Sequence, residues 1–173
     1  SNMSPVAFID TIRMFVLMHG PRTDLISTND ISVAFLQANE FDEGDKRYVS
    51  YKAFKEATEY VFELCGPLYG QRIASKQWYC TIASWLCDRG FVQAQNEPCL
   101  FTYTNGHSLV IHVDEILCRG TRAVSLEFYR LMVIKFQCKD PEFLEPGRYL
   151  TFTGMDIGLE LDGIDQIYSI SQE

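Results

Sequence analysis

Three carboxylates are the side chains whose types and positions most readily suggest chemistry. Asp30 closes an extended segment before an apolar stretch, and Asp114 and Glu115 stand together at a tight turn between strongly apolar runs. Carboxylates in apolar surroundings must be solvated or neutralised. Mg²⁺ can neutralise them, because it takes oxygen ligands and keeps several waters. Two such ions about 3.5–4 Å apart activate an attacking oxygen and steady a leaving group. From residue types alone, a plain polar turn and a capping role for Asp30 stand as alternatives.

The strands that would position the acidic pair are indicated by a turn signal. Asn105-Gly106 lies between two apolar runs, which is the strongest short signal for a β-hairpin. Residues 100–104, 107–113 and 116–118 are therefore expected to form a three-stranded antiparallel meander, with Asp114 and Glu115 at its second turn.

The other elements follow from apolar periodicity and caps. Ser4 as N-cap and Pro5 at the first helical position predict a well-buried helix over residues 4–19. Further helices are expected over residues 73–89 and 121–136. The remaining extended segments are residues 25–30, 48–51 and 59–65, with a last strand pair formed by residues 150–161 and 167–170 around Asp162-Gly163.

The composition is that of a globular chain. Of its 173 residues, 47% are hydrophobic and 22% charged, and 12 Phe, 9 Tyr and 2 Trp can build a core, which excludes disorder. No apolar run approaches the roughly 18 residues that a membrane helix needs, so no membrane partner is expected. Strands and helices together indicate an α+β domain with an antiparallel sheet on one side and helices on the other.

Cysteine usage and the start of the chain add two expectations. The six cysteines form no CxxC pair and have no histidine at zinc-finger spacing, so they are interpreted as reduced thiols that act as small buried hydrophobes in an intracellular protein. The first three residues, Ser1-Asn2-Met3, are typical of an expression scar before a start methionine, and no signal peptide is evident.

The net charge of −8 argues against nucleic-acid binding for the chain as a whole. Its distribution weakens that objection. Residues 142–173 hold seven acids and one base, whereas residues 46–139 hold twelve bases and eight acids. The middle of the chain could therefore face phosphates.

Six blocks, in order, resemble the reverse transcriptases of copia-type LTR retrotransposons. Residues 30–36, D-I-S-V-A-F-L, resemble their D-V-K-T-A-F-L motif, and residues 112–117, H-V-D-E-I-L, resemble Y-V-D-D-I-L. Residues 68–79, L-Y-G-Q-R-I-A-S-K-Q-W-Y, resemble L-Y-G-L-K-Q-A-P-R-A-W-Y. The other blocks are G-F at 90–91 with P-C-L-F at 98–101, F-Q-C-K-D at 136–140 and G-M-D-I at 154–157. The ordered set is specific where no single block is.

This resemblance implies that residues 4–173 are a polymerase palm domain, an antiparallel sheet backed by helices. Part of the fingers-side connection is included, and the finger strands, thumb and ribonuclease H domain are absent. The implied function is RNA-directed DNA polymerisation, by two-metal transfer of a nucleotide to a primer 3′-hydroxyl. The implied partners are an RNA or DNA template, a DNA primer, deoxynucleoside triphosphates and the integrase and ribonuclease H domains. The implied location is a cytoplasmic virus-like particle, the nucleus or both.

Single residues acquire roles from the same resemblance. Asp30 and Asp114, with the backbone carbonyl of Ile31, would hold Mg²⁺ or Mn²⁺, and Glu115 would complete the catalytic set. The residues implied to bind the nucleotide are Phe35, as the ring that excludes a 2′-hydroxyl, with Tyr69, Gly70 and Arg72. Those implied to contact the primer are His112, Val113, Gly154 and Met155. Core packing is the alternative for Phe35.

Four departures from the family pattern bear on activity. His112 replaces a tyrosine, Glu115 the second aspartate, Ser75 a proline and Ile73 a glutamine. They leave open a second hypothesis, a diverged or host-retained palm that lacks catalysis and binds nucleic acid or protein. In either case the chain alone is expected to be inactive.

Overall fold

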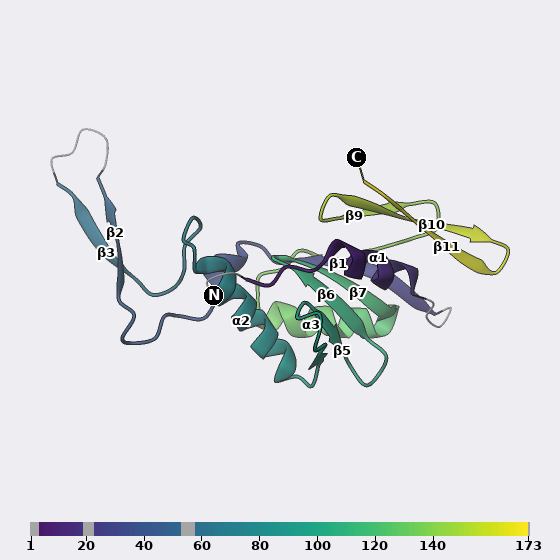
Figure 1. The fold of residues 1–173 in the computed structure, drawn as a ribbon, viewed down its shortest axis with the longest axis horizontal. Coiled ribbons are helices and arrows are strands. Elements are labelled where there is room, and N and C mark those ends of the chain that lie inside the picture. The colour runs from purple at the N-terminus through teal and green to yellow at the C-terminus, as the bar shows by residue number, and fades with distance from the viewer. Residues whose placement is uncertain (1–3, 19–22, 53–57, 173) are drawn as a thin grey trace.

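The computed structural model describes residues 4–18, 23–52 and 58–172. A six-stranded antiparallel sheet forms the centre, and a two-stranded hairpin projects at one end of the molecule (Figure 1). A separate three-stranded sheet lies toward the other end (Figure 1). The mixed architecture with antiparallel sheets agrees with the expected fold class. None of the described helices combines the length and the apolar character that crossing a membrane requires.

The central sheet has the strand order β4-β5-β6-β7-β1-β8. Its strands are β1 (Asp24–Asp30), β4 (Val92–Gln93), β5 (Leu100–Thr102), β6 (Ser108–His112), β7 (Glu115–Thr121) and β8 (Glu142–Phe143). Strands β5, β6 and β7 form the antiparallel meander that the Asn-Gly signal predicts. β1 pairs with β7 over its whole length, from Asp24 opposite Thr121 to Asp30 opposite Glu115. The end of β1 therefore lies beside the β6–β7 turn.

Among the described residues, the helices that cover this sheet are α1 (Ile9–Leu17), α2 (Ala74–Cys87) and α3 (Arg122–Lys135). Successive side chains of a strand face opposite sides of its sheet. Leu109 and Ile111 of β6 pack in one core with α2 and α3, whereas Val110 packs in a second core with α1 and the three-stranded sheet. The expectation that all helices lie on one side is therefore wrong. Both faces of the sheet are apolar, so both need a cover.

The helices α2 and α3 agree closely with their predicted ranges. Trp78 and Trp85 of α2 are buried, as expected, and the Trp85 ring packs edge-on against Phe136 with ring centroids 5.3 Å apart. The Thr121 hydroxyl caps α3 by accepting a 3.3 Å hydrogen bond from the Val124 amide. The ranges of both helices follow from apolar periodicity, whereas the Thr121 cap is a finding of the structure.

Helix α1 begins later than its sequence signals predict. Ser4 and Pro5 precede the helix, which starts at Ile9. The Glu97 carboxylate, from the β4–β5 loop, accepts a 3.2 Å hydrogen bond from the Phe8 amide and a 2.8 Å bond from the Thr11 hydroxyl. A distant residue therefore fixes the start of α1. His19 and Gly20, at the predicted end, lie outside the described residues.

The strand predicted over residues 150–161 is two strands. They are β9 (Tyr149–Phe152) and β10 (Met155–Asp162), and β11 (Asp165–Ser171) completes the order β11-β10-β9. Thr153 and Gly154 have φ angles of 51° and 75°. Two successive residues in this left-handed region make the tight turn that suits a two-residue hairpin.

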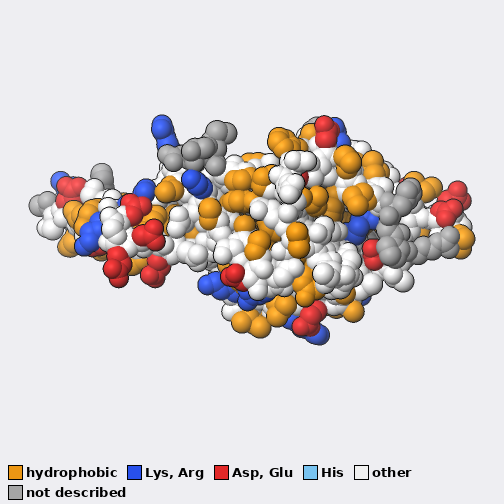
Figure 2. All heavy atoms as spheres, turned by 60° about the horizontal axis from the view of Figure 1, so that its bottom comes forward, with side chains coloured by type: hydrophobic (Ala, Val, Ile, Leu, Met, Phe, Trp, Pro, Cys, Tyr) orange, Lys and Arg blue, Asp and Glu red, His pale blue; other side chains and the backbone are white. Residues whose placement is uncertain are grey.

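The projecting hairpin consists of β2 (Arg47–Tyr51) and β3 (Tyr60–Leu64), which confirms the expected extended segments. A short 3-10 helix, η1 (Ala34–Gln37), lies between β1 and β2. Nearly every residue of the two strands is exposed on both faces of the hairpin. Figure 2 shows hydrophobic and charged side chains intermixed on this projection, at the left of the view.

All six cysteines are free thiols, in agreement with the expectation that they are reduced. Burial raises the pKa of Cys99 to about 12 and also raises the pKa of Cys118, so both remain protonated. Cys65, Cys80 and Cys87 are exposed, so the interpretation of all six as buried hydrophobes is wrong.

Candidate functional site

The three residues predicted to supply carboxylates lie at the same end of the central sheet. Asp30, the last residue of β1, lies opposite Glu115, the first residue of β7. Asp114 occupies the turn just before β7, and its carbonyl accepts a 2.9 Å hydrogen bond from the Ile31 amide. Glu115 is therefore a strand residue rather than part of the turn, because it pairs with both His112 and Asp30.

The turn that carries Asp114 is held by the helix beneath it. Val113 has a φ angle of 58°, which is costly for a β-branched residue. The buried Trp78 of α2 donates a 2.7 Å hydrogen bond from Nε1 to the Val113 carbonyl. This contact stabilises a strained backbone, and such strain is typical of functional turns.

Lys139 forms an ion pair with Asp30, one of the predicted metal ligands. Its Nζ donates a 2.8 Å hydrogen bond to Oδ2 of Asp30, and its backbone amide bonds to the Asp30 carbonyl. The hydrogen bond and charge of Asp30 raise the pKa of Lys139, and the charges of Asp114 and Glu142 add to the rise. Asp30 and Asp114 thus act electrostatically on the same ammonium group.

Glu115 faces the three-stranded sheet. Its Oε2 accepts a 2.9 Å hydrogen bond from the Thr153 amide, in the β9–β10 turn. Asp30, Glu115 and Lys139 line a polar cavity of about 250 Å³, which Tyr149 and Thr151 of β9 also line. The cavity therefore lies between the end of the central sheet and the β9–β10 hairpin.

The residues predicted to contact a primer lie close to this hairpin. His112 ends β6, and its ring packs edge-on against Phe152 at 6.4 Å. Its Nδ1 is buried and has no hydrogen-bond partner among the described residues. Gly154 follows Thr153 in the β9–β10 turn, whereas the Met155 side chain is buried in the second core. Only the backbone of Met155 is available for contacts.

Two of the predicted nucleotide-binding residues are neighbours. The rings of Phe35 and Tyr69 lie 4.8 Å apart, and Phe35 is half-buried against the α2 and α3 core. Gly70 has a φ of 90°, which favours glycine there, although a Cβ would meet no atom within 4 Å. Arg72 is exposed.

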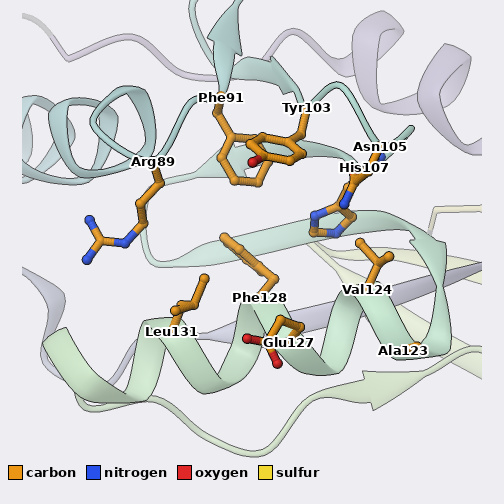
Figure 3. A pocket seen from close by; sticks show the side chains of 10 residues that line it. All are labelled: Arg89, Phe91, Tyr103, Asn105, His107, Ala123, Val124, Glu127, Phe128 and Leu131. Atoms are coloured by element: carbon orange, nitrogen blue, oxygen red, sulfur yellow. Dashed lines mark hydrogen bonds between the residues drawn. The ribbon is translucent and has the colours of Figure 1, made fainter.

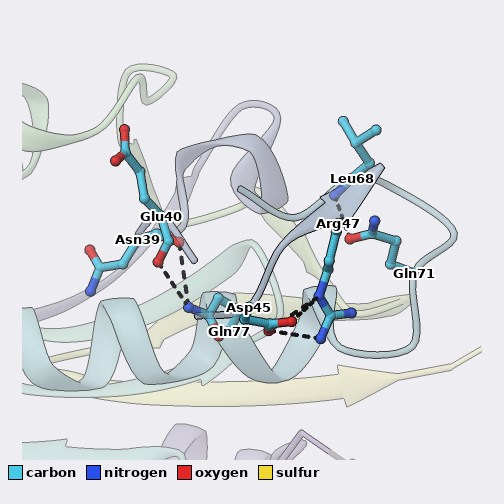
Figure 4. Close-up of polar contacts among 7 residues, drawn as sticks. All are labelled: Asn39, Glu40, Asp45, Arg47, Leu68, Gln71 and Gln77. Atoms are coloured by element: carbon cyan, nitrogen blue, oxygen red, sulfur yellow. Dashed lines mark hydrogen bonds and ion pairs between the residues drawn. The ribbon is translucent and has the colours of Figure 1, made fainter. Parts of the chain in front are cut away.

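The loop before α2, which holds Tyr69, Gly70 and Arg72, has polar contacts near the start of that helix (Figure 4). Gln71 accepts a 3.1 Å hydrogen bond from the Leu68 amide through Oε1. Gln77 of α2 donates from Nε2 to the carbonyls of Asn39 and Glu40, each at 3.5 Å. The first contact closes the loop before α2 on itself, and the other two tie the segment after η1 to α2.

The donor chemistry suits a hard cation, although the described residues contain no cluster of three or more His, Cys, Asp or Glu side chains that could hold a metal. Asp30 and Asp114 are oxygen donors of the type that Mg²⁺ prefers. Lys139 and Thr153 were not anticipated as neighbours of the site. Lys139 stands within the F-Q-C-K-D block, which was its only sequence signal.

Comparisons with known proteins define the family. A family model described as reverse transcriptase (RNA-dependent DNA polymerase) matches residues 1–172. The retrovirus-related Pol polyprotein from transposon RE2 of Arabidopsis thaliana is 30% identical over 127 residues, which cover 72% of this chain and 9% of that protein. The corresponding polyprotein from transposon RE1 is 31% identical over 120 residues, 68% of this chain and 8% of that protein.

The chain belongs to the reverse transcriptase family. Its resemblance to the enzymes of copia-type retrotransposons, first seen in six short blocks, is confirmed by the match over almost the whole sequence and by the two transposon polyproteins. The chain spans less than a tenth of the length of these relatives.

Proposed function

We propose that residues 4–173 are the palm of an RNA-directed DNA polymerase encoded in a retrotransposon polyprotein. The observation that carries this proposal is the position of Asp30 beside the strained, acidic turn at Asp114 in a member of the reverse transcriptase family. An RNA or DNA template, a DNA primer and deoxynucleoside triphosphates would be the substrates. The integrase and ribonuclease H regions of the polyprotein would be its partners.

The carboxylates of Asp30 and Asp114 and the carbonyl of Ile31 would hold Mg²⁺ or Mn²⁺. When bound, these ions would supply charge stabilisation for attack of the primer 3′-hydroxyl on the nucleotide α-phosphate. The backbone of the Val113–Asp114 turn, fixed by Trp78, would keep the Asp114 carboxylate in position. Glu115, which lies opposite Asp30 on the neighbouring strand, would complete the catalytic set.

The other residues would bind and orient the substrates. Phe35, supported by Tyr69, would lie under the sugar and exclude a 2′-hydroxyl. Gly70 and Arg72 would face the nucleotide from the loop before α2. The groups that would contact the primer strand are His112, Val113 and the backbone of Gly154 and Met155. The hydrogen bond from the Thr153 amide to Glu115 holds the β9–β10 turn, which contains Gly154, next to the start of β7.

A specific observation favours the second candidate, a palm without catalysis that binds nucleic acid or protein. Lys139 already neutralises Asp30, and Glu115 is engaged by the Thr153 amide. A site satisfied by its own protein groups has less need of a metal.

Primer extension by the full-length reverse transcriptase distinguishes the two. Asp114→Asn should lower the rate by at least about 100-fold, because a metal-ligating charge is lost. Asp162→Asn, an exposed position at the far end of β10, is the matched control and should leave the rate unchanged. Equal activity of Asp114→Asn and the control would overturn the proposal. A folded but inactive unmodified enzyme would favour the binding module.

A further inference from the structure

A second cavity lies at the other end of β6 from the candidate catalytic turn. It has a volume of about 370 Å³ and is formed by the end of α2, the β5–β6 hairpin and one side of α3 (Figure 3). Its lining consists mainly of apolar and aromatic side chains, among them Phe91, Tyr103, Val124, Phe128 and Leu131. This volume is within the range of about 300–1,000 Å³ that is usual for small-molecule sites.

The cavity walls are aromatic rings that contact one another. Phe91 packs against Tyr103 at 5.1 Å and against Phe128 at 5.6 Å, measured between ring centroids. His107 lies 5.2 Å from Phe128 and 5.8 Å from Phe91. These rings meet at angles between 46° and 66°, so they pack tilted or edge-on against one another. Such a lining favours a planar aromatic occupant.

His107 is the polar group of this wall. Its side chain is turned toward the cavity (Figure 3), the residue is 2% exposed, and Nε2 has no hydrogen-bond partner among the described residues. Burial lowers the pKa of His107 to about 4, so the imidazole is neutral near pH 7 and one ring nitrogen is an acceptor. A buried polar atom without a partner is costly, and a ligand could supply the missing bond.

The His107 ring also lies close to the backbone of β7. A Cβ at Gly120 of β7 would come within 2.9 Å of Cδ2 of His107. Glycine at this position therefore lets the imidazole approach the strand closely.

The charged groups at the rim are already engaged. The Arg89 guanidinium lies 4.0 Å over the Trp85 ring and donates to the Trp85 carbonyl. The Glu127 carboxylate lies 3.4 Å from Nη1 of Arg130. Neither charge needs a counterion from a ligand, so the cavity favours an uncharged occupant.

We propose that this cavity binds a neutral, planar aromatic small molecule that donates a hydrogen bond to the imidazole of His107. The site is separate from the candidate catalytic end. β6, whose five residues span about 17 Å, runs between His107 and the turn at Asp114.

Titration of the ¹⁵N-labelled chain with indole, followed by amide chemical shifts, tests this site. Indole is neutral and planar and has one N–H donor, and 1-methylindole is its counterpart without the donor. Indole should shift the amides of the cavity lining with a single dissociation constant, and 1-methylindole should bind about fivefold more weakly. In His107→Phe, which keeps a ring but removes the acceptor, the two probes should bind equally.

A cavity-filling variant gives an independent check. Leu131→Trp should weaken indole binding at least tenfold, because the larger ring occupies the cavity. Ile134→Trp, on the same helix but 80% exposed and outside the lining, is the matched control and should not change it. Absence of shifts in the lining at the solubility limit of indole, or equal binding of both probes to the unmodified chain, would overturn the proposal. The cavity would then be a surface for protein packing.

Discussion

His107 shows how one buried side chain sets a pH dependence. Its imidazole is neutral in the folded chain, because burial lowers its pKa from 6.5 to about 4. In the unfolded chain the same group takes up a proton below about pH 6.5. Between these two values the unfolded state binds more protons than the folded state, so stability falls as the pH is lowered.

We therefore expect His107 to cost about 3 kcal/mol of folding free energy between pH 6.5 and pH 4. Urea unfolding at pH 7.0 and pH 4.5 should show the loss, and His107→Phe should show a smaller one. Phenylalanine preserves the ring contacts with Phe91 and Phe128 and does not titrate. Equal pH dependence in both proteins would assign the effect to other groups.

Lys139 sets the balance of charge at the candidate metal site. Removing its ammonium in Lys139→Met leaves Asp30 without its hydrogen-bonded cation. Mn²⁺, measured by electron paramagnetic resonance, should then bind severalfold more tightly. Lys135→Met, at the end of α3, removes the same charge elsewhere and is the control. Unchanged affinity in Lys139→Met would mean that Mn²⁺ binds away from Asp30.

Among the elements, those with local signals were predictable and those fixed by distant contacts were not. The Asn105-Gly106 hairpin is read from a few adjacent residues. The start of α1 depends on Glu97, which is 86 positions from Thr11. The family resemblance implied that Asp30 lies beside the turn at Asp114, whereas the ion pair of Asp30 with Lys139 depends on how the segment after α3 packs against β1. Sequence patterns do not reveal that packing.

The end of α1 depends on a distant residue as well. Arg119 of β7 is 5% exposed, and its guanidinium donates a 2.5 Å hydrogen bond to the Met18 carbonyl and a 2.6 Å bond to the Val16 carbonyl. A cation at a helix C-terminus also interacts favourably with the helix dipole. The guanidinium further contacts the Tyr168 ring of β11 at 5.6 Å. One side chain thus joins α1, the central sheet and the three-stranded sheet.

Arg119→Met should destabilise the chain by about 2–4 kcal/mol, because the buried Val16 carbonyl and the partly buried Met18 carbonyl lose their donors. Urea unfolding followed by circular dichroism measures this change. Arg122→Met removes an exposed arginine that pairs with Glu145 and should cost less than about 1 kcal/mol. If both variants lost the same amount, the guanidinium would not act as a helix cap.

For the whole molecule, the described surface indicates a part that works within something larger. The β2–β3 hairpin exposes Tyr48, Tyr51 and Phe62, and a two-stranded hairpin alone is marginally stable in water. The relatives are more than ten times longer than the matched segment. The net charge of −8 opposes contact with a phosphate backbone unless other regions supply cations. Under the proposed function, these features argue that part of the grip on template, primer and nucleotide would come from outside this chain.

The chain alone should therefore not extend a primer, whatever its carboxylates can do. Polymerisation requires the reacting atoms to be held about 3–3.5 Å apart, and this positioning supplies much of the rate. Glu115 also places its carboxylate differently from an aspartate, because its side chain is longer by about 1.5 Å. Productive sites tolerate a displacement of a catalytic group of only about 0.5 Å. Any affinity for a primer–template duplex should be low and should fall steeply with salt.

Primer extension on an RNA template, with Mg²⁺ or Mn²⁺, measures this directly. The 173-residue chain should give no product above an Asp30→Ala control. Clear extension above that control would show that the palm suffices without the surrounding regions. Primer extension by the full-length enzyme shows whether the missing regions or Glu115 cause the inactivity of the chain. If it is active as it stands, Glu115 is compatible with catalysis and the missing regions explain the inactivity of the chain. If it is inactive and Glu115→Asp restores it, the glutamate itself is the defect.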